Sequence, residues 1–423
     1  MRALVLLLLG VGLIWAVLTF FPRNDELGEP TPGGVEPAEV VEDQAPDSVQ
    51  VKPEPKVKPE PAPKRSSFQV PVGQADLIEI GSVLAHKDAV AVRSRLDGSA
   101  GLLGADLEAA TLAFALAAEG DRPGARNVAK RISSAEALSA RVRWALQRLL
   151  ASDFASPWPD SIAGGSALEA GMIQRLGLVE AAALHAQRQD ALAAQRLTPV
   201  FLGELDAPWP ADFAALKEWR VLLDKIQARH RWNPKGTWPS EQVVVESGDS
   251  LTLIRKRYAA EHTDRLMCTG LIARANDLKD DLIHPDDVLR IPSAKVSMLV
   301  DLDAHFLLYL HDDEVVAAYP VGIGAEGEET ILGDFTIGEK QEEPTWFRPD
   351  GPPIVYGEAG NALGTRYMSW YQDGAKTHFG FHGTWEPETI GSNKSQGCIR
   401  LLNADVEEFF LVVPRDTSFH VQP

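Results

Sequence analysis

Hydrophobic residues form one uninterrupted run near the start of the chain, at positions 3–21. At about 1.5 Å per residue, a helix of this length is long enough to cross the apolar part of a bilayer. Arg2 precedes the run and acidic residues follow it, which places the N-terminus inside. We therefore predict a signal anchor or transmembrane helix over 1–21. Cleavage as a signal peptide is the alternative, but small residues are missing where the cut would fall.

Polar and proline-rich sequence replaces this apolar run over 22–67. The segment ends in the near-repeat VKPEPKVKPEPAPKR, and it holds few residues that could be buried. Proline removes backbone donors, and so little apolar surface does not offset the entropy cost of ordering. We predict a disordered linker that, at about 3.1 Å per residue in polyproline II, extends on the order of 100 Å.

Helical periodicity begins after this linker and continues over 68–235. Segments 106–119 and 135–150 carry apolar residues at helical spacing, with breakers at 120–124 between them. The run from 118 to 125 resembles the turn of a tetratricopeptide repeat, but no 34-residue period follows. The pattern predicts an all-α, possibly repeat-like domain. It serves either as a scaffold or as a surface for a protein partner.

Alternating strand patterns appear only in the second half of the chain. Residues 241–292 read as strand, helix, helix and strand, with a Ser-Gly-Asp turn suited to cap the first helix. Residues 295–423 read mainly as strands, including a hairpin with Asp-Asp at its turn. One further helix is expected from Asn403 to Leu411, with the Asn403 to Asp405 segment as its cap.

Composition narrows the classes of function. The formal net charge of −19 argues against a nucleic-acid-binding protein. The chain has 2 cysteines, in different predicted domains, so we expect both to be free and Cys268 to be buried and inert.

Candidate chemistry concentrates between His378 and Arg400. Cys398 lies sixteen positions after His382, and a thiol needs a neighbouring base or positive charge to attack near neutral pH. The peptide N–H groups of Gly397 and Cys398 are candidates to stabilise an oxyanion, and Arg400 to hold a carboxylate. A lone cysteine or histidine is more often structural. A metal site at His378 and His382 lacks a third ligand motif, so we expect none.

The order of motifs in this region resembles the L,D-transpeptidase catalytic domain family (YkuD-type). The shared positions are His382-Gly383-Thr384, Glu386-Pro387, Ile390-Gly391, Ser395 and Gly397-Cys398-Ile399-Arg400, preceded by Thr330 to Phe335 and Asn361 to Arg366. Two positions depart from the family pattern. Gln396 replaces a histidine and Ile331 replaces a proline.

The preceding segment resembles a LysM domain, a family whose members bind glycans containing N-acetylglucosamine. The matching positions are Val245, Gly248 to Leu251, Ile254 to Tyr258, Asn276 to Leu278 and Ile291-Pro292. The departure is the insertion-like stretch AAEHTDRLMCTG between the two helices.

The residue patterns predict an N-terminal membrane anchor and an all-α region, and the resemblances add a βααβ LysM-like domain and a mostly-β L,D-transpeptidase sandwich, so we expect a multidomain cell-wall enzyme. The resemblances imply a 3-3 cross-linking reaction on peptidoglycan stem peptides through a Cys398 thioester, with His382 as base and no cofactor. Ser395 would support the imidazole or the loop, and Gly397 the oxyanion. The implied substrate-binding residues are Gly383, Thr384, Gln396, Arg400 and Arg366.

The same resemblance leaves other activities open. An L,D-carboxypeptidase, hydrolase or exchange enzyme would share the acyl-enzyme, and an inactive peptidoglycan-binding protein would keep only the LysM-like domain. Gln396 cannot titrate, so any proton transfer by the family histidine is missing. With the anchor, the expected location is the inner (cytoplasmic) membrane, with one span and the catalytic domain in the periplasm or cell wall.

Overall fold

A computed structural model describes residues 74–86, 88–99, 102–152, 154–159, 166–202, 213–348 and 351–423. All of these residues belong to one unit, Phe68–Pro423. The predicted anchor over 1–21 and linker over 22–67 lie outside the described residues. Within the ranges given above, no helix combines the length and the hydropathy needed to cross a membrane.

The first half of the described chain is helical, as predicted. Helices α1 to α8 span Gln74–His86, Ala89–Gly98, Ala105–Ala118, Arg122–Ala129, Ala140–Ala151, Ala167–Ala186, Asp190–Leu202 and Phe213–His230, with the 3₁₀ helix η1 at Ala135–Ala137. Two predicted boundaries were wrong. Pro123 and Gly124 lie in the first turn of α4, where the missing proline N–H costs nothing and Asp121 caps Gly124 N–H. The helix expected over 135–150 starts at Ala140, because Ser139 caps it.

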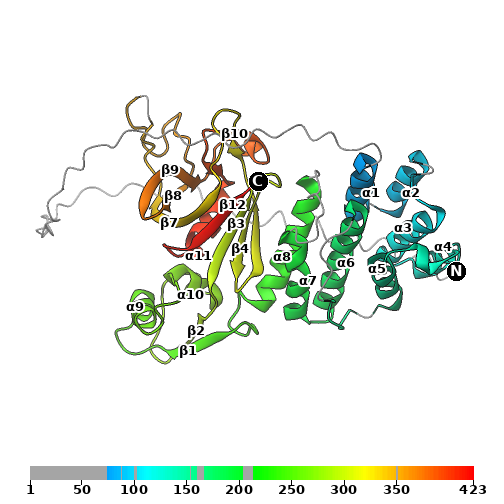
Figure 1. Ribbon diagram of the computed structural model, residues 1–423. Coiled ribbons are helices and arrows are strands. Elements are labelled where there is room, and N and C mark those ends of the chain that lie inside the picture. The colour runs from blue at the N-terminus through cyan, green and yellow to red at the C-terminus, as the bar shows by residue number, and fades with distance from the viewer. Residues whose placement is uncertain are drawn as a thin grey trace, which may run out of the picture. The chain divides into compact units, whose positions relative to one another are not determined.

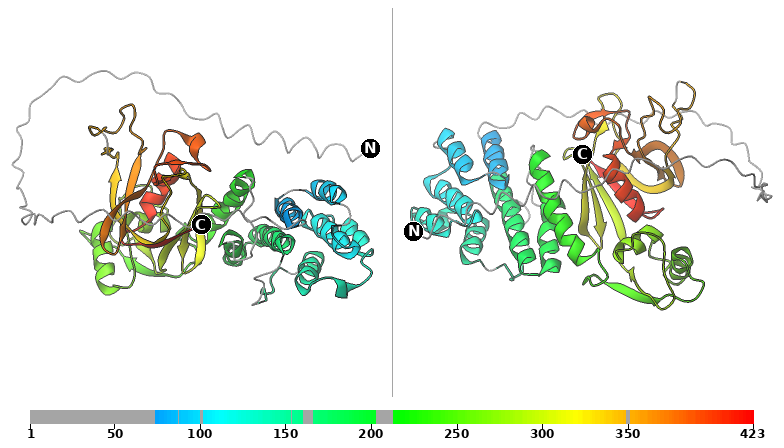
Figure 2. Two further views of the ribbon diagram at one scale, coloured as in Figure 1. Left: turned by 45° about the horizontal axis from the view of Figure 1, so that its top comes forward. Right: turned by 180° about the vertical axis from the view of Figure 1, so that it is seen from behind.

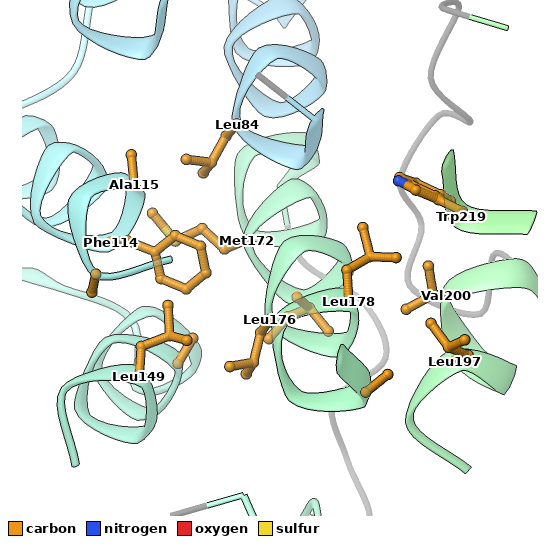
Figure 3. Packing of buried hydrophobic residues seen from close by; sticks show 14 of the residues in the cluster. Leu84, Phe114, Ala115, Leu149, Met172, Leu176, Leu178, Leu197, Val200 and Trp219 are labelled. Atoms are coloured by element: carbon orange, nitrogen blue, oxygen red, sulfur yellow. The ribbon is translucent and has the colours of Figure 1, made fainter. Parts of the chain in front are cut away.

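Helix α6 forms the centre of this region and is buried on most of its circumference. Phe114 of α3, Leu149 of α5 and Leu197 of α7 approach it from different sides (Figure 3). A helix surrounded in this way must be apolar all round, which explains its uniform composition. Its one buried carboxylate, Glu180, is paired with both Arg148 and Arg196.

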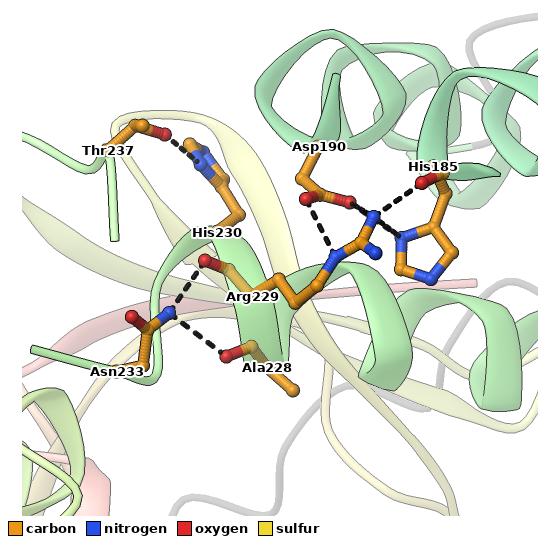
Figure 4. A network of polar contacts seen from close by, with 7 residues as sticks. All are labelled: His185, Asp190, Ala228, Arg229, His230, Asn233 and Thr237. Carbon is orange, nitrogen blue, oxygen red and sulfur yellow. Dashed lines mark hydrogen bonds and ion pairs between the residues drawn. The ribbon is translucent and has the colours of Figure 1, made fainter. Parts of the chain in front are cut away.

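Helix α8 joins the helical region to the rest of the unit. Arg229 of α8 bonds Asp190 at the start of α7 and the His185 carbonyl at the end of α6 (Figure 4). The Asn233 amide donates to the Arg229 carbonyl at 2.6 Å and so closes the C-terminal end of α8. The imidazole of His230 bonds the Thr237 hydroxyl at 2.9 Å, which fixes the chain as it leaves the helix.

The predicted βααβ unit is present. Strands β1 (Ser240–Val244) and β2 (Val288–Pro292) pair antiparallel, and helices α9 (Leu251–Glu261) and α10 (Thr269–Ala275) connect them. The capping residue is Ser250, whose hydroxyl accepts from Leu253 N–H, and not the Ser-Gly-Asp turn just before it. Asp249 instead accepts from the N–H of Glu246 and so closes the turn itself.

The C-terminal part is mostly β, as predicted. Its elements are β3 Val296–Asp301, β4 Phe306–His311, β5 Glu314–Pro320, β6 Ile323–Gly324, β7 Gly333–Glu342, β8 Arg366–Gln372, β9 Ala375–His382, η2 Pro387–Thr389, β10 Asn393–Ser395, β11 Ile399–Arg400, α11 Asn403–Val412 and β12 Ser418–Gln422. Eight strands form one sheet in the order β11-β9-β8-β7-β12-β3-β4-β5, and β10 pairs with β6. The eight-stranded sheet and the two-stranded sheet together account for the mostly-β character that we predicted.

Helix α11 packs against this sheet (Figures 1 and 2). Phe409 of α11 contacts Tyr309 of β4, Tyr319 of β5 and Phe381 of β9, so one aromatic side chain joins three strands. The prediction that Asn403 caps this helix was wrong, because Leu402 is the capping residue and makes no side-chain bond. The Asn403 side chain instead accepts a hydrogen bond from Thr365 N–H at 3.2 Å.

Two contacts connect α8 to the sheet and α11. Arg220 forms a forked pair with Asp405 of α11, with N to O distances of 2.9 and 2.6 Å. Gln227 donates to the Val315 carbonyl at 3.1 Å. Figure 1 shows α6, α7 and α8 side by side, followed by the sheet.

Candidate active site

Cys398 lies beside the strand that carries His382. Strands β9 and β11 run parallel with Arg400 opposite His382, so the register places Cys398 beside Gly380. The Cys398 Sγ is 3.8 Å from the His378 carbonyl oxygen. Gly380 and His382 are two residues apart on β9 and therefore point to the same face of the sheet. Cys398 lies beside Gly380 on the neighbouring strand, so the thiol and the imidazole share that face. The register thus places the two residues that the sequence singled out on neighbouring strands.

His382 is held in one tautomer. Its Nδ1 lies 2.6 Å from the carbonyl oxygen of Gly383, and the side chain is 4% exposed. A carbonyl oxygen only accepts hydrogen bonds, so Nδ1 carries the proton and Nε2 keeps its lone pair. The imidazole is therefore oriented as a base with Nε2 as the accepting atom.

Burial keeps both groups neutral at rest. Loss of solvent lowers the pKa of His382 to about 4, and the charge of Arg400 acts in the same direction. Burial also raises the pKa of the Cys398 thiol to about 11, opposed by the Gly380 peptide N–H and by Arg400. Both shifts favour an uncharged thiol and an uncharged imidazole at neutral pH over a thiolate and an imidazolium.

The loop before Cys398 is closed by hydroxyl groups. The Ser395 hydroxyl donates to the Cys398 carbonyl at 2.6 Å and accepts from Gly397 N–H at 3.2 Å. The Thr330 hydroxyl donates to the Gly397 carbonyl at 2.9 Å. Of the two supporting roles considered for Ser395, the geometry fits the loop, since the His382 Nδ1 bonds Gly383.

Gly397 is required by the geometry of this loop. Its φ is +97°, and a Cβ here would lie 2.6 Å from the Phe379 ring. Its N–H already donates to the Ser395 hydroxyl. The expectation that this N–H points at an oxyanion is therefore not met in this structure. The Gly380 N–H, which faces the thiol, is a donor that sequence reasoning did not identify.

The two candidate arginines differ in position. Arg400 lies next to His382 across the strands, and its Nη1 is 3.2 Å from Glu386 and 3.5 Å from the Thr389 hydroxyl. Its Nε is buried without a hydrogen-bond partner among the described atoms.

Arg366 is turned away from the thiol. Its guanidinium donates to the Thr365 carbonyl at 2.8 Å and stacks over Phe410 of α11 at 5.5 Å. It is also 3.4 Å from Glu342 on the neighbouring strand. Side chains alternate along β8, so Arg366 and the adjacent Tyr367 point to opposite faces. Of the two roles we considered for Arg366, this position fits loop structure.

Three further candidates take different positions. A Cβ at Gly383 would lie 2.2 Å from the Asn403 side chain, so this glycine permits close packing. Thr384 is buried, and its hydroxyl accepts from Glu386 N–H at 3.0 Å. Gln396 is exposed at the tip of the loop, within reach of an incoming ligand.

Sequence reasoning missed Tyr367. This residue lies opposite His382 in the β8–β9 pairing, and a Cβ on Gly380 would come within 2.5 Å of its ring. Burial and the nearby Cys398 raise the pKa of its phenol. Tyr367 thus forms a wall of the thiol site.

An exposed aromatic side chain follows His382 in the loop after β9. Trp385, three residues after His382, is 51% exposed and packs on Tyr356 with ring centroids 6.0 Å apart. Asn361 holds the intervening loop, because its amide donates to the carbonyls of Pro344 and Ile354. The motif Asn-x-Leu-Gly-x-Arg therefore positions a loop and does not itself supply a reactive group. Throughout the described ranges, no group of three His, Cys, Asp or Glu side chains could hold a metal ion.

Comparison with known proteins identifies the class to which this fold and site belong. The family model of the L,D-transpeptidase catalytic domain (YkuD) matches residues 295–421, and the LysM domain model matches residues 243–292. The protein named "Putative L,D-transpeptidase YkuD" from Bacillus subtilis is 31% identical over 175 residues, covering 41% of this chain and 93% of that protein. The chain therefore belongs to the L,D-transpeptidase family.

Other relatives are matched over less of their length. The protein of the same name from Bacillus licheniformis is 32% identical over 29% of this chain, and the match spans 64% of that protein. "Probable L,D-transpeptidase ErfK/SrfK" from Escherichia coli is 31% identical over 34% of this chain and 47% of its own length. The solved catalytic domain of an E. faecium L,D-transpeptidase acylated by ertapenem is 25% identical, covering 30% of this chain and 96% of that chain, with a TM-score of 0.25.

Proposed function

We propose that this cell-wall L,D-transpeptidase forms 3-3 cross-links between peptidoglycan stems through a thioester on Cys398. The observation that carries the proposal is the parallel register of β9 and β11, which places Cys398 on the strand beside His382, whose Nδ1 is anchored on the Gly383 carbonyl. An imidazole fixed in this way offers its second nitrogen to a proton, which is what a cysteine nucleophile needs.

In the acylation step, the Cys398 sulfur attacks the carbonyl between the third stem residue and the terminal D-alanine. His382 takes the thiol proton as the bond forms and gives it to the departing D-alanine amine. The negative charge on the tetrahedral oxygen needs nearby N–H donors, and the Gly380 N–H at the thiol is available on the protein side. D-alanine leaves and a thioester remains.

In the second step, the amine of a neighbouring stem attacks the thioester. His382 takes the proton from that amine and returns it to the sulfur as the new amide forms. Because Gln396 does not titrate, both proton transfers fall to His382. Water in place of the amine would release a tripeptide and make the enzyme an L,D-carboxypeptidase.

The other parts of the chain have supporting roles in this proposal. The LysM-like domain would hold glycan strands, and the span predicted over 1–21 would keep the enzyme at the inner membrane, with its catalytic domain outside. We propose the boundaries 68–235, 241–292 and 295–423 for the three folded domains. The helical domain would serve as a scaffold or bind a protein partner.

Intact mass spectrometry tests the chemistry. The full chain is incubated with a disaccharide-tetrapeptide or a carbapenem, beside Cys398→Ala and the matched control Cys268→Ala. A covalent adduct in the wild type and Cys268→Ala, but not in Cys398→Ala, supports the thioester. A product with the mass of two stems less one D-alanine supports cross-linking.

Two other results would change the proposal. Tripeptide without the cross-linked dimer would assign a carboxypeptidase. No adduct with either reagent would mean that catalysis has been lost, and binding of glycan strands by the LysM-like domain would then be the remaining function.

A further inference from the structure

The insertion between α9 and α10, where the chain departs from the LysM pattern, builds a second site. It lines a cavity of about 670 Å³ together with residues of the catalytic domain. The insertion contributes His262, Arg265 and Cys268, while Lys340 of β7 and Arg415 come from the catalytic domain. A volume of this size is typical of a ligand pocket.

The cavity is cationic although the whole chain carries a net charge of −19. Its lining includes Arg255, Arg265, Lys340 and Arg415, with Asp416 as the acidic member. Like charges gathered at one concave surface repel each other, and an anionic ligand would relieve that repulsion.

Only some of the cationic side chains in the cavity make hydrogen bonds or ion pairs within the protein. Arg265 is 2.9 Å from Glu241, and Lys340 donates to the carbonyls of Phe410 and Val413. No ion pair or hydrogen bond is found for Arg255 or Arg415 among the described side chains. The pKa of the Glu339 carboxylate is lowered by Lys376 and also by the charge of Arg415. Arginine presents a planar fork of donors that matches a carboxylate, so these two side chains are suited to bind one.

The cavity is separate from the thiol site. Lys340 faces the same side of the sheet as Met368 and Phe381, which are paired with it across β7, β8 and β9. The row that holds Tyr367 and Gly380, and with it the thiol, faces the other side. A ligand in the cavity therefore cannot be the group that Cys398 attacks.

We propose that this cavity binds the carboxylates of a peptide stem that is not undergoing reaction. The lining mixes the cations with threonine hydroxyls and with Leu266 and Met267, a combination suited to a peptide with carboxylates more than to a bare inorganic anion. The assignment of a wall stem as ligand rests on the proposed function. The cavity would hold a second part of the same polymer while the thiol site acts on the first.

Binding is tested in the full chain with Cys398→Ala, in which Cys268 is the single thiol. Isothermal titration uses a tetrapeptide stem, the same peptide with its carboxylates amidated, and inorganic phosphate. Methyl methanethiosulfonate then reports occupancy at Cys268, which lines the cavity. Burial raises the pKa of this thiol and makes its modification slow, so the rate is compared with and without peptide, and a bound peptide should slow it further.

The charge-reversed variant is Arg255→Glu with Arg415→Glu, and the matched control is Lys256→Glu, an exposed residue of α9 outside the lining. We expect the double variant to weaken stem binding at least tenfold and to remove Cys268 protection, while the control changes neither. Arg415→Gln alone, a milder change, should weaken binding in the same direction if the double variant unfolds.

Three results would overturn the proposal: equal binding of the stem and its amidated form, binding of phosphate without the stem, or no protection of Cys268. Carbapenem acylation of Cys398 is measured in parallel in the variants with Cys398 intact. We expect it to be unchanged, so loss of the cavity site and loss of the catalytic function give different results.

Discussion

The neutral resting state of the thiol and imidazole predicts how the reactivity of Cys398 depends on pH. Burial raises the pKa of the thiol from 9.0 to about 11. Each pKa unit is a factor of ten, so at pH 7 about one molecule in 10⁴ carries the thiolate, against about one in 10² for an unperturbed thiol of this pKa. Alkylation by iodoacetamide follows the thiolate, and at pH 7 it should be about a hundredfold slower than for an exposed cysteine.

The measurement is the alkylation rate between pH 5 and pH 10 in Cys268→Ala, which leaves Cys398 as the single thiol. We expect the rate to rise about tenfold per pH unit without a plateau. A rate that is high and flat between pH 5 and pH 8 would refute the reasoning, because it would indicate a preformed thiolate-imidazolium pair. His382→Gln separates the two cases further: it should leave a neutral thiol's profile unchanged but would abolish such a plateau.

The pKa of His382 predicts how acylation by the substrate depends on pH. The base must be uncharged, and burial lowers the pKa of His382 from 6.5 to about 4, so the uncharged form persists down to that pH. The value of kcat/KM should fall as the pH drops through about 4, and not through 6.5. A fall centred near 6.5 would show that the imidazole is more solvated than the structure indicates.

Three substitutions test other contacts. Ser395→Ala removes the bonds that close the thiol loop, and we expect carbapenem acylation to slow by roughly ten- to a hundredfold, with Ser392→Ala as a control of little effect. Arg220→Ala leaves the buried Asp405 carboxylate unpaired, so the free energy of unfolding should drop by about 3 kcal/mol in urea titration; a loss below about 1 kcal/mol would contradict this. Gly380→Ala places a methyl group against the Tyr367 ring and should abolish acylation. A smaller side chain at position 367 should then restore activity in the double variant.

The sequence predicted the strands well because their alternation follows from burial of one face. The β3–β5 region and β9 were identified as strands, and the hairpin at Asp312-Asp313 has positive φ at both residues, as a tight turn of this kind requires. The pairing of β9 with β11 is a different matter. It joins segments separated by a loop, so the residues suggested a link between His382 and Cys398 but their spacing did not predict that the two strands pair.

Local hydrogen bonds account for most of the errors. Gly397 N–H was assigned to an oxyanion, but the Ser395 hydroxyl two residues earlier takes it, and Asn403 bonds Thr365 from a distant loop in place of capping α11. Both bonds are 3.2 Å long and depend on the positions of individual atoms, which residue spacing does not specify. Tyr367 was missed for the same reason, since its role comes from lying opposite His382.

The contact between α10 and α11 fixes the distance between the LysM-like domain and the catalytic thiol. A Cβ at Gly270 would lie 2.1 Å from the Leu411 carbonyl, and Arg274 pairs with Glu408 at 2.9 Å, so the LysM-like and catalytic domains meet without a flexible tether. A catalytic domain on a flexible linker would bring its thiol to every stem within reach of that linker. If the LysM-like domain holds a glycan strand as proposed, a fixed thiol would meet only the stem at one distance from the sugar that is held.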